Sequence, residues 1–344
     1  MTPSPHLPPA DLPVPDAAAR GATRADGRDR RSLSRRALLA AAAVVPVAFA
    51  GGAAARGGDS PPPPAGPAPA GPDAAPRGTP APAAPGIVPE VVRPSDLVWA
   101  LRGTLPLVIV AAHGGTARIP GAVERTTGVR KRDVATLEIA VLVATRVAQA
   151  TGRKPYLVGA LFHRKDADAN RPVEEGTSSP AAAAEHAAHH GAIRAYVDEV
   201  RRVHGAGLLV DVHGQARLPD AVVRGTRNGK TVTRLLAARG AAALTGPDGI
   251  FGRLAAGGFV VVPPNEGGDE PGSGDDDDGL APERILAGGY TVDRYGSHRE
   301  DGIDAVQIEL GSRLRERVED TAKALAEALV AFLAAHGPDA PSKR

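Results

Sequence analysis

Two short apolar runs that each end in a histidine constrain the fold of this chain more than any other feature. Residues 107–112 lead to the first histidine, His113, and residues 207–212 lead to the second, His213. A short, continuous run rich in β-branched residues is typical of a strand buried in a parallel sheet. Ligands of open α/β sheets bind beyond the carboxyl ends of such strands, so both imidazoles are expected at one ligand-binding edge.

Strand-like runs alternate with amphipathic helical stretches along most of the chain. Strands are expected at residues 105–112, 154–161, 207–212, 259–263 and 305–310, and helices at 131–151, 181–204 and 316–336. This alternation predicts an α/β fold in which a mixed, mainly parallel sheet lies between helices. The apolar periodicity extends from Val91 to Ala335, about 245 residues, which is the size of a single large domain.

The residues before this domain have the composition of an export signal and a spacer. A basic segment, an apolar segment and a small-x-small exit occupy residues 30–50, and the paired Arg35 and Arg36 are typical of a twin-arginine signal. The apolar segment is short for a membrane span, so no stable span is expected after cleavage, although a retained signal could act as an anchor. We expect a signal peptide (1–50), a Pro/Ala/Gly-rich disordered linker (51–89), a folded domain (90–337) and a disordered tail (338–344).

Composition excludes several classes of function. The chain has no cysteine, which rules out disulfides, a lipoprotein anchor and cysteine-based zinc or nucleophile sites. Its formal net charge is only +2, much of the positive excess lies in the N-terminal arginine cluster, and aromatic residues make up 3%. Because nucleic-acid surfaces need basic patches and stacking aromatics, no nucleic-acid partner is expected.

His113 and His213 supply two of the roughly three protein ligands that a hydrolytic metal site needs. The third ligand should be a nearby carboxylate or histidine, and Asp133 and Glu138 both lie in the helical stretch that follows the first strand. Five residues rotate a helix position by about 140°, so both carboxylates can hardly serve at once. We prefer Asp133, with a helix-capping role as the alternative. The expected cofactor is Zn²⁺ or another divalent metal.

Glu309 is the predicted catalytic residue. It lies in an apolar run, where a carboxylate is costly to bury unless it is paired or functional. Beside a metal, a carboxylate can take a proton from water and pass it to a leaving nitrogen. The alternative is an ion pair with Arg313 or Arg315 at the end of the strand.

An unusually polar segment, residues 163–172, follows the strand expected at 154–161. Arg171 could clamp a substrate carboxylate in a bidentate manner, and Asp168 and Asn170 could orient the substrate. A salt-bridged surface loop is the alternative on composition alone.

Two further groups of polar residues are expected outside the site. The adjacent His189 and His190 point in different directions on a helix, and we expect them at its surface. The acidic run 275–278 lacks the ordered alternation of a calcium loop, and we expect it in a solvated loop.

In chain order, these residues resemble the N-formylglutamate amidohydrolase family over positions 105–315. The resemblance rests on His113-Gly114-Gly115-Thr116, Asp133, Asp168-Ala169-Asn170-Arg171-Pro172, Asp211-Val212-His213-Gly214, Gly288-Gly289-Tyr290 and Gln307-Ile308-Glu309. It implies a fold similar to zinc carboxypeptidases and aspartoacylase, a divalent metal usually taken as zinc, and hydrolysis of an amide on an acidic amino acid.

The resemblance also implies roles for individual residues. His113, His213 and Asp133 correspond to metal ligands, Glu309 to the general acid/base, Arg171 to an anion clamp and Arg313 to a further substrate contact. Glycine stands after each site histidine, at positions 114 and 214, where the family often has serine.

The leading hypothesis is an exported metal-dependent amidohydrolase that cleaves an N-acyl or peptide-type amide carrying an acidic group. An exported enzyme would rarely meet formylglutamate, which favours a peptide or a cell-wall amide. The alternative is a non-catalytic cell-envelope protein that binds an anionic ligand through Arg171. A passive wall-associated module is disfavoured, because it has no need of the polar cluster around Asp168 beside a core strand.

Overall fold

The computed structural model describes residues 91–265 and 280–340, which build one mixed sheet. Its strands are β1 (Val91–Ser95), β2 (Val98–Leu101), β3 (Leu107–Ala111), β4 (Tyr156–Ala160), β5 (Leu208–Gly214), β6 (Ala221–Gly225), β7 (Val260–Val262) and β8 (Asp304–Leu310). They form an eight-stranded sheet in the order β1-β2-β4-β3-β5-β8-β6-β7. Four neighbouring pairs are parallel and three are antiparallel, which confirms the predicted mixed, mainly parallel α/β sheet.

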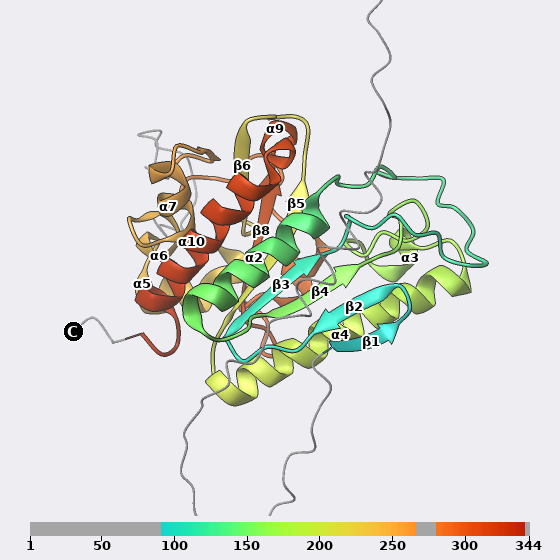
Figure 1. The fold of residues 1–344 in the computed structure, drawn as a ribbon, viewed down its shortest axis with the longest axis horizontal. Helices are drawn as coiled ribbons and strands as arrows, with labels where there is room; N and C mark the ends of the chain where they lie inside the picture. Colours follow the sequence, from blue (N-terminus) through green and yellow to red (C-terminus); the bar gives the residue numbers. More distant parts are fainter. Residues whose placement is uncertain (1–90, 266–279, 341–344) are drawn as a thin grey trace, which may run out of the picture.

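Helices cover both faces of this sheet (Figure 1). They are α2 (Thr136–Thr151), α3 (Val173–Gly176), α4 (Pro180–His204), the 3₁₀ turn η1 (Lys230–Val232), α5 (Thr233–Arg239), α6 (Ala242–Thr245), α7 (Ile250–Ala256), α8 (Tyr290–Tyr295), α9 (Ser312–Glu316) and α10 (Val318–His336). Helices α2 and α10 pack against each other over one face, whereas α4 and α8 cover the other. Each face therefore has its own apolar core.

The alternation of side chains along β3 explains its continuous apolar sequence. Leu107 and Ile109 belong to the core under α2 and α10, while Val108 and Val110 belong to the core under α4. Because successive side chains of a strand point to opposite faces, a strand covered on both sides must be apolar at every position.

The same alternation places four polar side chains together at the carboxyl ends of β5 and β8. Asp211 and His213 in β5, and Gln307 and Glu309 in β8, lie at every second position between residues of the α2–α10 core. The two strands are parallel, with Asp211 opposite Gln307 and His213 opposite Glu309. All four are buried, and buried polar groups need partners or a function.

The helix expected at 131–151 begins only at Thr136. Ala135 has a positive φ of 68°, which ends the preceding loop with a left-handed residue. Asp133 therefore lies in a loop, whereas the sequence predicted that it would lie in the first turn of the helix. This loop crosses the carboxyl ends of the strands, which brings Asp133 to the centre of the molecule.

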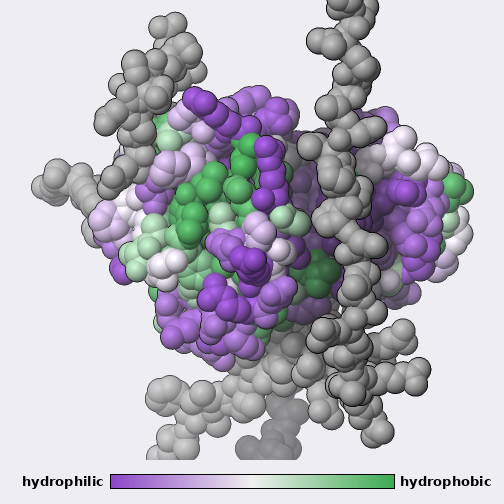
Figure 2. Space-filling view, turned by 90° about the horizontal axis from the view of Figure 1, so that it is seen from above, coloured by the Kyte–Doolittle hydropathy of each residue, from purple (hydrophilic) through white to green (hydrophobic). Residues whose placement is uncertain are grey.

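Several sequence predictions concern residues outside the described ranges. These are the signal peptide and linker (1–89), the acidic run at 275–278, and part of the tail (341–344). Among the described helices, none combines the length and apolarity that crossing a membrane would require. In the view of Figure 2 the surface is mostly hydrophilic, with one larger apolar area.

Candidate metal centre

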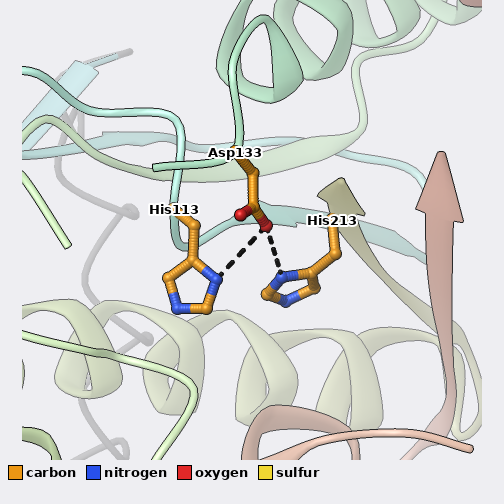
Figure 3. Close-up of side chains that lie close together, drawn as sticks. All are labelled: His113, Asp133 and His213. Carbon is orange, nitrogen blue, oxygen red and sulfur yellow. Dashed lines mark hydrogen bonds and ion pairs between the residues drawn. The ribbon is translucent and has the colours of Figure 1, made fainter. Parts of the chain in front are cut away.

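His113, Asp133 and His213 come together at the carboxyl ends of the central strands (Figure 3). His113 follows β3, His213 lies in β5, and Asp133 comes from the loop before α2. One ligand atom from each lies within 4.8 Å of the others, and all three residues are buried. The imidazole centroids are 4.7 Å apart, inside the separation of about 6 Å that two nitrogen ligands of one ion allow.

Backbone hydrogen bonds fix Asp133 between the two histidine-bearing strands. Its amide donates to the carbonyl of His113 at 2.9 Å, and its Oδ2 accepts from the amide of Gly214 at 3.1 Å. Glu138, the other candidate ligand, lies in the first turn of α2 and is not in the group of three. The structure thus brings Asp133, the preferred third ligand, to the two histidines.

A carboxylate behind each histidine sets which ring nitrogen faces the centre. Nε2 of His113 donates to Oδ1 of Asp168 at 2.7 Å, and Nε2 of His213 donates to Oδ2 of Asp211 at 2.9 Å. With the proton on Nε2, the lone pair of each Nδ1 is directed toward Asp133. Carboxylates that hold ligand histidines in this way are a regular feature of metal sites.

The distances from Asp133 to the two imidazoles fit a small divalent ion. Two ligands about 2.0–2.1 Å from a tetrahedral zinc ion lie about 3.3 Å from each other. Oδ2 of Asp133 lies 3.4 Å from Nδ1 of His113 and 3.3 Å from Nδ1 of His213. Within the described residues, Nδ1 of His113 is buried and makes no hydrogen bond, an arrangement that is costly unless the atom has a ligand. The residues present therefore fit Zn²⁺.

Electrostatics inside this group favour a positive charge at its centre. Burial alone would raise the pKa of Asp133, but the neighbouring imidazoles of His113 and His213 hold that pKa well below its ordinary value. Burial alone would lower the pKa of His213, but the carboxylates of Asp211 and Asp133 hold it well above its ordinary value. A metal that binds through His213 must therefore displace a proton.

Asp168 contacts His113 and is not among the residues that line the cavity, so these contacts do not support its predicted role in binding substrate. One carboxylate oxygen accepts from His113, and the other accepts from Nε of Arg164 at 3.1 Å and lies 3.5 Å from Nη1 of Arg125. Arg164 also donates to Oδ1 of Asp133 at 3.2 Å. Asp168 is 1% exposed, and both of its oxygens are engaged by these neighbours.

A cavity of about 480 Å³ opens beside the three ligands, and Glu309 lies in its wall. Nε2 of Gln307 donates to Oε1 of Glu309 at 2.9 Å, and burial raises the pKa of Glu309. Of the two arginines considered as ion-pair partners for Glu309, Arg313 pairs with Asp220 and Arg315 donates to backbone carbonyls. The contacts of Glu309 therefore favour the acid/base interpretation over the structural ion pair.

Asn170 and Arg171 both line this cavity, but they differ in exposure to solvent. Asn170 is buried, donates to Oε1 of Gln307 at 3.2 Å and accepts from the amide of Thr291 at 2.8 Å. A Cβ on Gly289 would lie 2.2 Å from the Asn170 amide, so this position requires glycine. Arg171 is exposed at the cavity wall, as a clamp for a substrate carboxylate must be.

Arg313, predicted to contact substrate, is not among the residues that line the cavity. It is at the surface, where its guanidinium pairs with Asp220 at 2.7 Å. Arg315 lines the cavity instead and donates to the carbonyls of Leu310, Val134 and Gln215. The reason is helical geometry, because two positions along α9 turn a side chain to the opposite side.

The glycines after the two site histidines make room for neighbouring protein atoms. A Cβ on Gly114 would lie 2.6 Å from the backbone nitrogen of Leu137, and one on Gly214 would lie 2.6 Å from Nε of Arg315. A side chain at position 114 would therefore clash with the backbone of α2, and one at position 214 would require Arg315 to move.

The histidines of α4 are not at the helix surface, contrary to expectation. His189 is fully buried. Nε2 of His190 donates to the carbonyl of Ala169 at 2.8 Å, and Nε2 of His186 donates to that of Arg171 at 2.9 Å. These side chains therefore hold the segment that carries Asp168, Asn170 and Arg171.

Replacing Asp168 by asparagine is expected to weaken zinc binding about 10–100-fold, the usual effect of losing a carboxylate behind a ligand histidine. The substitution keeps the volume but removes the charge that holds Nε2–H of His113. Competition with a chromogenic chelator measures the affinity. The matched control is Asp198→Asn, an exposed residue of α4 that pairs with Arg194. Equal zinc affinity in the two variants would contradict the assigned role.

No protein-family model matches the chain, and no curated protein sequence is significantly similar to it. Several solved structures are similar in fold. N-formylglutamate amidohydrolase from Ralstonia eutropha is 17% identical, with a TM-score of 0.41, over 69% of this chain and 95% of that one. Succinylglutamate desuccinylase from Vibrio parahaemolyticus is 14% identical, with a TM-score of 0.36, and the match covers 70% of this chain and 71% of that one. N-acetylmuramoyl-L-alanine amidase from Clostridium difficile is 13% identical, with a TM-score of 0.30, and the match covers 67% of this chain and 98% of that one.

The first of these proteins has the name of the family that the sequence motifs resemble. Likenesses of this size carry no information about substrate, which has to come from the residues of the site.

Proposed function

We propose that this protein is a metal-dependent amidohydrolase that cleaves an N-acyl or peptide-type amide carrying an acidic group. One observation carries the proposal: a buried His-Asp-His group, with a carboxylate behind each histidine, lies in the same cavity as the buried Glu309. Metal ligands with a carboxylate nearby are the parts that hydrolysis of an unactivated amide needs.

The three ligands would hold Zn²⁺ through Nδ1 of His113, Nδ1 of His213 and Oδ2 of Asp133. A zinc ion bound there supplies Lewis-acid polarisation of a carbonyl and lowers the pKa of water. Arg164, which contacts both Asp133 and Asp168, keeps the ligand carboxylate oriented.

Glu309 moves the proton that the reaction requires. Its carboxylate accepts a proton from the attacking water and then delivers that proton to the leaving nitrogen. Gln307 holds it in position, and burial raises its pKa, which brings the carboxyl closer to the working pH of a proton carrier. The net reaction adds water across the amide and gives a carboxylate and an amine.

The charge of the cavity supports an acidic substrate. The cations that line it are Lys131, Arg132, Arg164, Arg171 and Arg315, against the carboxylates of Asp133 and Glu309. Arg164 is paired with Asp133 and Asp168, which leaves the charges of Lys131, Arg132, Arg171 and Arg315 for a ligand. Arg171, exposed at the wall, is the group we assign to a substrate carboxylate.

We also propose that the protein is exported by its twin-arginine-type segment, which lies outside the described residues. The composition of residues 30–50 supports this location. Cell fractionation of the full chain beside an Arg35→Lys/Arg36→Lys variant tests it, and an unchanged distribution would contradict it.

The deciding experiment combines metal analysis with a panel of substrates. Purified protein is expected to contain about one zinc per chain, and to hydrolyse N-acyl acidic amino acids or acidic peptides faster than their neutral amide counterparts. Dialysis against a chelator should abolish the activity, and zinc should restore it. A protein that takes up zinc and binds these compounds without cleaving any of them would support the alternative, a cell-envelope binding protein.

A further inference from the structure

A second hollow, which no step of the proposed reaction uses, lies next to the site cavity and shares lining residues with it. This hollow has a volume of about 750 Å³ and is lined by the segment that precedes Asp133, together with Glu124 and His163. It shares Val129, Lys131 and Arg132 with the 480 Å³ cavity of the metal centre. A cavity of about 300–1,000 Å³ already accommodates a small ligand, so the second hollow provides space beyond the scissile amide.

Three consecutive cations, Arg130, Lys131 and Arg132, line this second hollow. Arg130 donates to the carbonyl of Arg125, and Arg132 donates to that of Gly114, so these contacts leave both charges uncompensated. Among the described residues, no ion pair of Lys131 is found. The hollow is therefore positively charged.

The acidic residue in the wall of the hollow does not cancel this charge. Glu124 lies 3.5 Å from Nζ of Lys165 and 3.7 Å from Nη2 of Arg118, two cations outside the hollow's lining. With Glu124 neutralised by those neighbours, the net positive charge of the lining remains for a ligand.

The segment that carries these cations is fixed to the metal centre by one buried arginine. Arg125 is 3% exposed and donates to the carbonyls of Thr127, Val129 and Arg164. It also lies 3.5 Å from Asp168, the carboxylate that holds His113. The hollow is thus formed before a ligand arrives, and a preformed site loses less free energy to ordering on binding.

Apolar side chains lie between the cations. Val129 and Val134 are 56% and 52% exposed, and both line the hollow. A small carboxylate metabolite has few apolar atoms to pack against these valines. A peptide can pack its backbone and the aliphatic parts of its side chains against them. A polyanionic sugar offers fewer apolar atoms for the same valines.

We propose that the substrate is an acidic peptide of about three residues or more, which runs from the metal centre into the hollow lined by Arg130, Lys131 and Val134. This inference rests on the proposed function and specifies the substrate class. One acidic residue occupies the cavity beside Arg171, and the next residues place their carboxylates on the consecutive cations. At about 3.3–3.6 Å per residue of extended chain, two further residues reach about 7 Å beyond the scissile amide.

Binding to the zinc-loaded Glu309→Gln variant tests the proposal without turnover. Fluorescence anisotropy of a labelled triglutamate is expected to give a dissociation constant at least tenfold lower than a competition assay gives for N-acetylglutamate. Adding Arg130→Glu, at a residue that lines the second hollow and not the cavity of the metal centre, should weaken triglutamate binding about tenfold, and should affect N-acetylglutamate much less. The binding should also weaken as salt is added, because exposed charges are screened.

A matched control makes the same substitution elsewhere. Arg253→Glu affects α7, where the side chain pairs with Asp248 at the surface. This variant should leave triglutamate binding unchanged. Triglutamine should bind at least tenfold more weakly than triglutamate.

Three results would overturn the proposal: equal affinity for triglutamate and N-acetylglutamate, equal effects of Arg130→Glu and Arg253→Glu, or competition by polygalacturonate as strong as by triglutamate. Since the assay measures binding alone, a failure of hydrolysis would contradict the proposed function and leave this result intact. Conversely, hydrolysis of short N-acyl amino acids with no gain for the peptide would refute only the extended substrate.

Discussion

Replacing His213 by alanine is expected to abolish zinc-dependent stabilisation and hydrolysis together. Zinc that binds only the folded protein, at about 1,000 times its dissociation constant, stabilises the fold by about 4 kcal/mol. A domain of this size gains about 2–4 °C in Tm per kcal/mol, so wild-type protein should gain about 8–16 °C on zinc addition. The variant loses one of three ligands, and its Tm should scarcely respond.

The control for this prediction is His204→Ala, which removes an imidazole from the end of α4, outside the metal group. Its zinc-dependent gain in Tm should equal that of the wild type. A zinc-dependent shift that persists in His213→Ala would show that His213 is not a ligand. Differential scanning fluorimetry with and without a chelator measures all three proteins, and their zinc-free values of Tm report any loss of folding separately.

The zinc-dependent gain in Tm should also decrease as the pH falls from about 8 to about 5.5. The pKa of His213 is raised in the folded, zinc-free protein, so its proton stabilises the fold below the unfolded pKa of about 6.5. That contribution is lost as the pH rises through the folded pKa. Zinc needs the unprotonated ring, so its affinity rises over the same interval. A larger zinc effect at the lower pH would contradict this linkage.

The parts of the site that lie on strands could be predicted from the sequence. A buried parallel strand has to be apolar on both faces, so a histidine or glutamate at its carboxyl end stands out against the run that precedes it. His113, His213 and Glu309 are all of this kind, and the parallel order of β3, β5 and β8 brings them to one edge.

The same reasoning could have found Asp211 and Gln307. Each lies two residues before a site residue, and a two-residue step along a strand returns to the same face. Asp211 therefore had to lie beside His213, and Gln307 beside Glu309. The signal was present in the sequence, but the roles depend on hydrogen bonds that only the structure provides.

Contacts made by loops could not be predicted in this way. The loop position of Asp133 depends on the left-handed turn at Ala135, which alanine does not signal. Arg125 reaches Asp168 from a separate segment. Arg164 lies only four residues before Asp168, but its contact depends on the course of that loop. Arg313 and Arg315 were equivalent in the sequence, and only the course of α9 decides that Arg315 lines the cavity.

Replacing Glu309 by glutamine is expected to lower kcat about 10²–10⁴-fold, the range that a positioned proton-transfer group contributes. Glutamine has the same shape and can keep a hydrogen bond with Gln307, but it cannot accept a proton from water. Because Glu309 is not one of the three ligands, zinc content and the dissociation constant for zinc should remain at wild-type values. Stopped assays of product amine, normalised to bound zinc, measure the effect.

Glu138→Gln is the matched control, since Glu138 lies on α2 outside the cavity and the same atoms are exchanged. It should keep wild-type kcat. Two outcomes would remove Glu309 from the mechanism: a variant with wild-type kcat, or a variant that loses zinc in proportion to activity. The second outcome would mean that Glu309 supports the ligand shell through His213, which lies opposite it in the sheet. Full zinc occupancy with little turnover therefore separates proton transfer from metal binding at this site.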